Sequence, residues 1–218
     1  RNGEVKDFIP TRARITVTTV KSYLSKKDGV GKVGVIRIKS FSGTTAATVT
    51  EKLKDLKGQG ATAFVIDLRR NPGGLLPGGV DTASLFLDVD RPIVYTVSKT
   101  GVIDSQKSLV TGLDIESPLV LFVDGNTASA AEVMTAALKE NKRAVVVGEQ
   151  TFGKGVVQTI RELSNNNGGV AVTVARYETP DRNDINKQGI KVDIPVSDCV
   201  SDNAVTCIPQ TAFNKPST

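Results

Sequence analysis

The stretch 119–148 constrains the fold most, because it reads as strand, helix and strand with short connections. Residues 119–123 and 144–148 are apolar and rich in β-branched side chains, and residues 128–140 between them are rich in alanine. A helix between two such strands implies a crossover connection, and a crossover makes the strands parallel. We therefore expect a partly parallel sheet with helices packed against it.

A second crossover is predicted upstream. Residues 33–38 suggest a strand, residues 44–57 carry apolar side chains at helical spacing, and residues 62–68 form a continuous apolar run. Such a run is typical of a strand that is buried on both faces. The glycine-rich segment 69–79 comes next, and we expect this segment to be irregular because it contains two prolines and four glycines.

Shorter patterns predict the remaining elements. The turn N-N-N-G-G at 165–169 separates two β-branched runs and indicates a hairpin. We expect strands at 12–20, 92–97, 102–110, 156–160, 170–177 and 190–196, a helix at 81–87, and a loop at 22–32.

Composition narrows the class of protein. The chain has 218 residues, which is enough for one sizeable core, and its 28 basic and 23 acidic residues are mixed along the sequence. Aromatic residues make up only 5% and are scattered, so the pattern argues against a nucleic-acid-binding surface. The longest apolar runs are too short to cross a bilayer. No basic-then-apolar leader opens the chain, so we expect any targeting segment to have been removed or to lie outside it.

Two cysteines, Cys199 and Cys207, lie near the C-terminus in a stretch with loop character. They are either incidental thiols or a disulfide that closes a small loop, and the second reading requires an oxidising compartment. A zinc site is disfavoured because the chain has no histidine and no other cysteine.

The absence of histidine also limits the chemistry of Ser129, which stands among small residues at the start of the predicted helix 128–140. Unpaired backbone N–H groups and the positive end of the helix dipole favour negative charge at such a position. A nucleophilic serine without imidazole must pass its proton to a lysine or a carboxylate. The alternative is that Thr127 or Ser129 only caps the helix.

Lys154 is the candidate base, in a glycine-flanked segment after the strand 144–148. The carboxyl ends of neighbouring parallel strands share one edge of a sheet, which would bring Lys154 near Ser129. A free lysine has a pKa of about 10.4, so we expect an apolar pocket to lower it toward neutrality. Gln158, four residues on, is a neutral partner that could orient the amine, whereas we interpret Glu132 as structural because its charge would favour protonated lysine. The alternative for Lys154 is a solvated residue at a turn.

Three motifs together resemble the carboxyl-terminal processing (tail-specific) proteases: D-L-R-R-N-P-G-G, N-T-A-S-A-A-E-V and G-E-Q-T-F-G-K-G-V-V-Q. The resemblance covers about residues 33–196. It implies an α/β fold similar to the crotonase and Clp-protease cores, built from ββα units with a mixed sheet flanked by helices, and a β-rich C-terminal part. The segments V-A-V-T-V-A-R-Y-E-T-P and D-I-N-K-Q-G-I resemble the photosynthetic branch, which trims a photosystem II reaction-centre precursor in the chloroplast thylakoid lumen. The alternative location is a bacterial periplasm or another extracytoplasmic compartment.

The resemblance also implies roles for individual residues. Ser129 is the nucleophile, Lys154 the general base and Gln158 a third member, while the backbone N–H groups of Gly74 and Ala130 form the oxyanion hole. No metal or cofactor is required, and the expected partners are protein C-terminal tails bound as extended peptides, including tails of membrane proteins.

Two features depart from the family pattern. Ala131 replaces a second serine that usually stands two residues after the nucleophile, and the family carries a peptide-binding PDZ domain upstream. We therefore expect residues 1–14 to be the tail end of a truncated PDZ domain and residues 15–218 to be the serine protease core.

Two other functions compete with the protease. Residues 148–155 fit the phosphate-binding pattern G-x-x-x-x-G-K, although glycine follows the lysine and residues 156–160 read as a strand where a helix is needed. The second alternative is a catalytically idle module that binds peptides or acyl groups on a crotonase-like scaffold.

Overall fold

The computed structural model describes residues 7–13, 17–164, 168–197, 199 and 201–214. Its elements, in chain order, are β1 (Val20–Lys27), β2 (Gly31–Ile38), α1 (Thr45–Gly58), β3 (Ala63–Asp67), α2 (Leu76–Ser84), β4 (Pro92–Ser98), β5 (Gly101–Lys107), β6 (Leu119–Val123), α3 (Ala130–Glu140), β7 (Val145–Gly148), β8 (Val156–Glu162), β9 (Gly169–Glu178), β10 (Ile194–Pro195), α4 (Ala204–Cys207) and the short 3₁₀ helix η1 (Gln210–Phe213). The expected mixed α/β class is confirmed. No helix in the described segments is long and apolar enough to cross a membrane.

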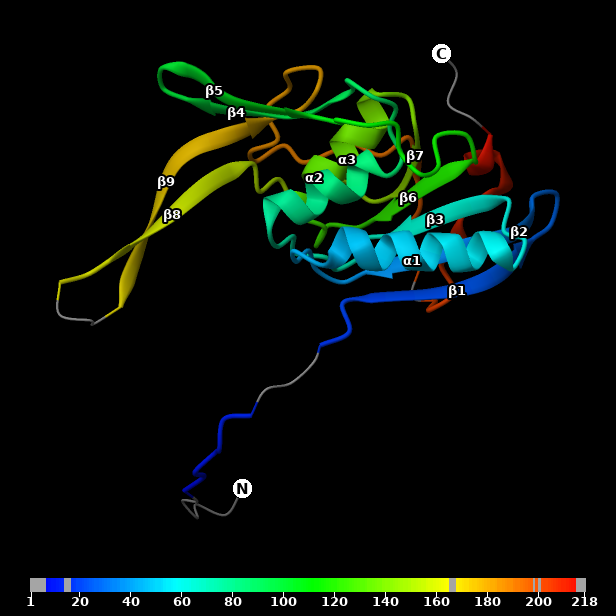
Figure 1. Ribbon diagram of the computed structural model, residues 1–218, viewed down its shortest axis with the longest axis horizontal. Helices are drawn as coiled ribbons and strands as arrows, with labels where there is room; N and C mark the ends of the chain where they lie inside the picture. The colour runs from blue at the N-terminus through cyan, green and yellow to red at the C-terminus, as the bar shows by residue number, and fades with distance from the viewer. Residues whose placement is uncertain (1–6, 14–16, 165–167, 198, 200, 215–218) are drawn as a thin grey trace.

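Two sheets organise the chain. The larger has the strand order β1-β2-β3-β6-β7-β10, in which β1 and β2 are antiparallel and the other neighbours are parallel. Both predicted crossovers are therefore confirmed. The smaller sheet has the order β5-β4-β9-β8 and is antiparallel, and its β8–β9 hairpin reaches away from the body of the molecule (Figure 1).

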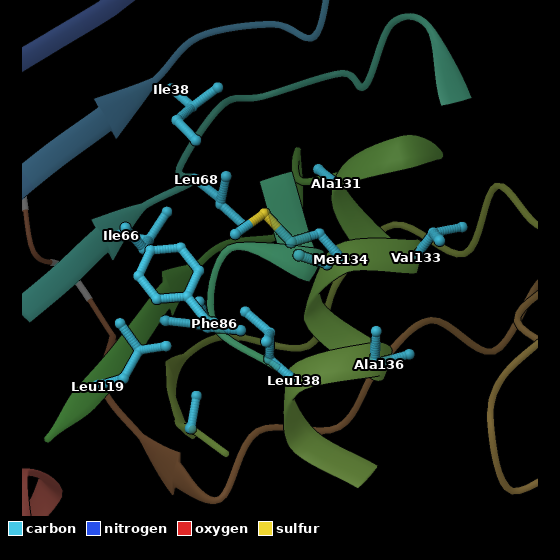
Figure 2. Packing of buried hydrophobic residues seen from close by; sticks show 14 of the residues in the cluster. Ile38, Ile66, Leu68, Phe86, Leu119, Ala131, Val133, Met134, Ala136 and Leu138 are labelled. Carbon is cyan, nitrogen blue, oxygen red and sulfur yellow. The ribbon is translucent and has the colours of Figure 1, made fainter. Parts of the chain in front are cut away.

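Helices α1, α2 and α3 cover one face of the six-stranded sheet (Figure 1). Figure 2 shows Met134 and Leu138 of α3 pointing toward Phe86 and Leu68, and all four side chains are fully buried. The opposite face is covered by the C-terminal segment, in which Val205 and Ile208 pack against Val33, Val65 and Val120. Strands β3 and β6 are buried along their whole length because both faces of this sheet are covered.

The predicted strand 12–20 and the predicted loop 22–32 were both wrong. Residues 17–19 are not in a strand, and 22–32 instead belong mostly to the β1–β2 hairpin, whose register runs from Val20 opposite Ile38 to Lys27 opposite Gly31. An Asp28-Gly29 pair in the turn explains the pairing, because glycine accepts the φ of 72° found there. β1 was not predicted as a strand because it contains lysines, which an edge strand tolerates since it needs only one apolar face.

The irregular segment predicted through residue 79 was too long, because α2 begins at Leu76 and ends at Ser84 rather than covering 81–87. Pro77 is tolerated in the first turn, where its missing N–H would have no helical partner. Gly78 and Gly79 are needed for close packing. A Cβ on Gly78 would lie 2.5 Å from the Ser42 carbonyl oxygen, and one on Gly79 would lie 2.8 Å from that of Ala130.

The predicted boundary between a PDZ remnant and the core stays a prediction. This boundary falls between residues 14 and 15. Residues 1–6 and 14–16 lie outside the described residues, and residues 7–13 form no helix or strand. The turn predicted at 165–169 falls partly on residues 165–167, which also lie outside the described residues.

Candidate active site

Ser129 stands at the N-terminus of α3, directly after the turn that leaves β6. Its backbone has φ 59° and ψ −122°, values that a residue with a side chain rarely adopts. The segment that follows β3 fixes this turn: Thr127 Oγ1 donates to the Leu68 carbonyl at 2.9 Å, and the Ala128 N–H donates to the Asn71 carbonyl at 2.9 Å. Strained backbone held by surrounding hydrogen bonds is concentrated at functional sites, so this conformation keeps Ser129 as a candidate functional residue.

The glycine-rich loop packs directly on this serine. A Cβ added to Gly73 would lie 2.8 Å from Ser129 Cβ and 3.0 Å from the Ala130 nitrogen, so only glycine fits. Gly74 has φ 138°, and its neighbours bridge to Phe41: the Phe41 N–H donates to Gly73 and the Leu75 N–H donates to Phe41. Within the described segments, the N–H groups of Gly74 and Ala130 donate to no protein acceptor. Ala130 follows Ser129 directly and Gly74 follows Gly73, the residue packed on Ser129, so both predicted oxyanion donors keep an N–H group without a protein acceptor in the described segments.

Glu132 joins the serine segment to the lysine segment. Its carboxylate is completely buried and accepts hydrogen bonds on both oxygens. Oε2 accepts from the N–H of Ser129 at 2.8 Å and from the N–H of Lys154 at 2.9 Å. Oε1 accepts from Thr151 Oγ1 and from the N–H of Gly153, both at 2.6 Å. The structural role expected for Glu132 is confirmed, and one oxygen holds the backbones of Ser129 and Lys154 together.

Lys154 lies in the irregular segment between β7 and β8. Its flanking glycines are required because the backbone passes close to another segment: a Cβ on Gly155 would lie 2.4 Å from the Asn186 nitrogen, and one on Gly153 would lie 3.0 Å from that of Gln188. Lys154 itself is exposed, so the expected apolar burial was wrong for this conformation. No hydrogen bond joins its amine to the Ser129 hydroxyl in the described part of the chain.

Gln158 lies on β8 and is also exposed. Its Nε2 donates to Thr173 Oγ1 on β9 at 3.5 Å, and a bulge in the pairing lies between Val157 and Gln158. The alternation that would point Gln158 and Lys154 the same way is therefore interrupted, and the structure does not bring the two side chains together.

A cavity of about 530 Å³ opens beside the serine turn and is lined by Arg70, Pro72, Asn126, Ala128, Phe152 and Lys154. Its apolar wall is formed by Pro72, Ala128 and the exposed ring of Phe152. The site is therefore an open depression with a mixed apolar and basic lining, large enough for one or two peptide side chains.

Arg69 anchors the base of the glycine-rich loop. Its Nε donates to Asp67 Oδ1 at 2.9 Å and its Nη2 donates to Asp67 Oδ2 at 2.8 Å, while its plane lies over the Phe122 ring. Burial acts to lower the pKa of Arg69, but the hydrogen bonds and charge of Asp67 outweigh it and raise that pKa. The guanidinium also donates to the Cys199 carbonyl at 2.9 Å.

Cys199 and Cys207 form a disulfide with a Cα–Cα separation of 5.9 Å, which decides between the two readings left open by the sequence. The loop that it closes contacts Arg69 through the Cys199 and Ser201 carbonyls. The C-terminal segment is thereby attached to the strand end from which the glycine-rich loop departs.

The phosphate-binding reading of 148–155 is excluded by the element that comes after the lysine. A phosphate-binding loop leads into a helix, whereas Val156 begins strand β8.

Comparison with known proteins agrees with this geometry. The model of peptidase family S41 matches residues 32–196. The chain belongs to peptidase family S41. Among curated S41 relatives, the carboxyl-terminal-processing protease of Picosynechococcus sp. is 46% identical over 193 residues, which are 88% of this chain and 46% of that protein. The chloroplastic carboxyl-terminal-processing peptidase 2 of Arabidopsis thaliana is 42% identical over 206 residues, which are 90% of this chain and 39% of that protein.

Solved structures show the same relationship. The photosystem II D1 C-terminal processing protease superposes with a TM-score of 0.79 at 34% identity, over 94% of this chain and 55% of that protein. This S41 chain spans less than half the length of the curated relatives it matches.

Proposed function

We propose that this chain is the catalytic core of a serine endopeptidase that cleaves near the C-terminus of protein substrates, with Ser129 and Lys154 as its dyad. The observation that carries the proposal is the Glu132 carboxylate, which binds the backbones of Ser129 and Lys154 through one oxygen. Membership of peptidase family S41 and the carboxyl-terminal-processing relatives support the reaction class.

Hydrolysis proceeds in two steps. The neutral Lys154 amine takes the Ser129 hydroxyl proton as the oxygen attacks the scissile carbonyl, and the lysine then gives that proton to the leaving amine. The free N–H groups of Gly74 and Ala130 stabilise the oxyanion. Water then attacks the acyl-enzyme with the same lysine as base, which restores the Ser129 hydroxyl.

In this proposal, the exposed position of Lys154 corresponds to the site without bound substrate. A bound peptide that covers the cavity would exclude water from the amine, and closure over the peptide would bring the amine to the hydroxyl. Gln158 would orient the amine after releasing Thr173, since a contact of 3.5 Å is weak.

The free edge of β8 offers a place for an extended substrate. β8 ends the four-stranded sheet and begins two residues after Lys154, so a peptide added to that edge passes the dyad. The finer proposal is a photosystem II reaction-centre precursor as substrate, in the chloroplast thylakoid lumen, with an upstream PDZ domain in the complete protein. It is supported by the D1-processing structure, the chloroplastic relatives and a disulfide suited to an oxidising compartment.

A serine-reactive fluorophosphonate probe tests the nucleophile. It should label the protein on Ser129, located by peptide mass spectrometry, and Ser129→Ala should remove the label. Ser22→Ala is the matched control, since it removes a hydroxyl from β1, and its labelling should equal that of the unmodified protein. Labelling that survives in Ser129→Ala would contradict the proposal. No labelling of the unmodified protein would favour the idle binding module.

A further inference from the structure

Arg70 places a free guanidinium at the mouth of the candidate site. It lines the cavity of about 530 Å³ together with Lys154 and the Ala128 backbone that precedes Ser129. Among the residues that line this cavity, two are basic and none is acidic. A peptide bound there meets an electrostatic environment that favours a negative group.

The backbone fixes Arg70 in this position. Its φ is 59°, its N–H donates to Asp124 Oδ1 at 2.9 Å, and the next residue, Asn71, accepts the Ala128 N–H. Glycine and asparagine adopt positive φ at least cost, so an arginine here sacrifices backbone stability. Strain of this kind is typical of positions where the side chain has a function.

The two adjacent arginines, Arg69 and Arg70, differ in their hydrogen bonding. The Arg69 guanidinium donates hydrogen bonds to Asp67 and to the Cys199 carbonyl. Arg70 is exposed, and its side chain forms no hydrogen bond or ion pair with any residue that the structure describes. Its five N–H donors are therefore available to a ligand.

The neighbouring cavity helps to locate the anion. That cavity, of about 300 Å³, shares Arg70 and Asn126 with the first, and it also contains Arg37 and Arg69 together with Asp124, Glu149 and Asp202. Its three acidic groups offset its three arginines, and two of those arginines, Arg37 and Arg69, already pair with Asp67, so it favours an anion less than the first cavity does. The favourable position is thus the first cavity, between Arg70 and the dyad.

We propose that Arg70 is a specificity-determining residue that binds a carboxylate of the substrate within a few residues of the scissile bond. The inference rests on the proposed function, because it assigns a peptide to the cavity beside Ser129. An arginine fork matches a carboxylate with two parallel hydrogen bonds, which gives direction as well as affinity. The carboxylate is either an acidic side chain or the chain terminus, and the two sources share this chemistry.

Peptide binding to the full chain with Ser129→Ala tests this without cleavage. Fluorescence anisotropy would compare one fluorescein-labelled peptide framework in three forms: neutral with an amidated C-terminus, neutral with a free C-terminus, and amidated with one glutamate placed at each position in turn. One of the charged forms should bind about tenfold to hundredfold more tightly than the neutral form. A preference for the free C-terminus would identify the terminus, and a preference for one glutamate position would identify a side chain.

Arg70→Gln in the same background should reduce that preference to about onefold, and Arg70→Lys should leave an intermediate value. Arg91→Gln is the matched control, because Arg91 is exposed and lines neither cavity, and it should keep the preference. Arg70→Gly should also lose the preference while its thermal unfolding midpoint does not fall, since glycine accepts φ 59° without strain. This variant separates loss of recognition from loss of fold.

Three results would overturn the inference: equal binding of charged and neutral peptides, a preference that persists in Arg70→Gln, or no binding of any peptide at millimolar concentration. The proposed function fails separately. If Ser129 resists the serine-reactive probe while the Arg70-dependent preference holds, the chain binds carboxylate-bearing peptides without cleaving them.

Discussion

Lys154→Ala should lower kcat/KM for peptide cleavage by about 10⁴-fold, the loss typical of removing one member of a nucleophile–base pair. The serine keeps its position, because Glu132 binds the Lys154 backbone rather than its side chain. The fold should be unaffected, since Lys154 is exposed. The measurement is cleavage of an extended peptide followed by mass spectrometry, with circular dichroism to verify the fold.

Lys154→Arg distinguishes a base from a positive charge. Arginine keeps the charge but does not release a proton in proteins, so this variant should be as inactive as Lys154→Ala. Lys99→Ala, at the exposed turn between β4 and β5, is the control and should retain full activity. More than a tenth of the activity remaining in Lys154→Ala would mean that another group accepts the proton.

Glu132→Gln should cost about 3 kcal/mol of unfolding free energy or more, although it changes the side-chain volume very little. Both carboxylate oxygens accept from N–H or O–H donors, so an amide NH₂ in either position faces a donor. Thr151 has little freedom to adapt, because its hydroxyl already accepts the Ile190 N–H at 2.7 Å. The thermal unfolding midpoint should fall by roughly 6–12 °C.

Glu140→Gln is the matched control on the same helix. Its carboxylate accepts from the Asp181 N–H and from Asn183 Nδ2, but the contact is exposed, so the cost should stay below about 1 kcal/mol. The rate of Ser129 labelling at a temperature where both variants are folded completes the test. If Glu132→Gln labels at the unmodified rate, the shared carboxylate is not needed to position the serine.

The crossover elements could be predicted because their patterns are long and their burial is complete. α3 (Ala130–Glu140) and β6 (Leu119–Val123) agree with the expected 128–140 and 119–123. β1 was missed because three of its eight residues are lysines, and only the Asp28-Gly29 pair pointed to the hairpin. The start of α2 was missed because proline and glycine have low helix propensity, whereas here Pro77 falls in the first turn and close packing requires Gly78 and Gly79.

Part of the candidate site could also be proposed from the sequence. Ser129, Lys154, Gly74 and Ala130 are recognisable from motifs, and the structure joins the backbones of Ser129 and Lys154 through Glu132, while their catalytic roles stay predictions. The spacing Ser-x-x-Glu from Ser129 to Glu132 signals a capping box, but its further bonds to Thr151 and Gly153 depend on how β7 returns beside β6, which no local pattern contains. The exposure of the Lys154 side chain also could not be predicted from the sequence, because it depends on which segments cover the site.

The unpaired side of β8 has a consequence for how tails are chosen. Hydrogen bonds along a sheet edge come from the main chain, which all peptides share, so under the proposed function this edge would accept almost any flexible terminus of sufficient length. Discrimination must then arise from contacts made by individual side chains and from whatever delivers a tail to the edge. Under the same proposal, folded termini would escape cleavage because they cannot extend along the strand.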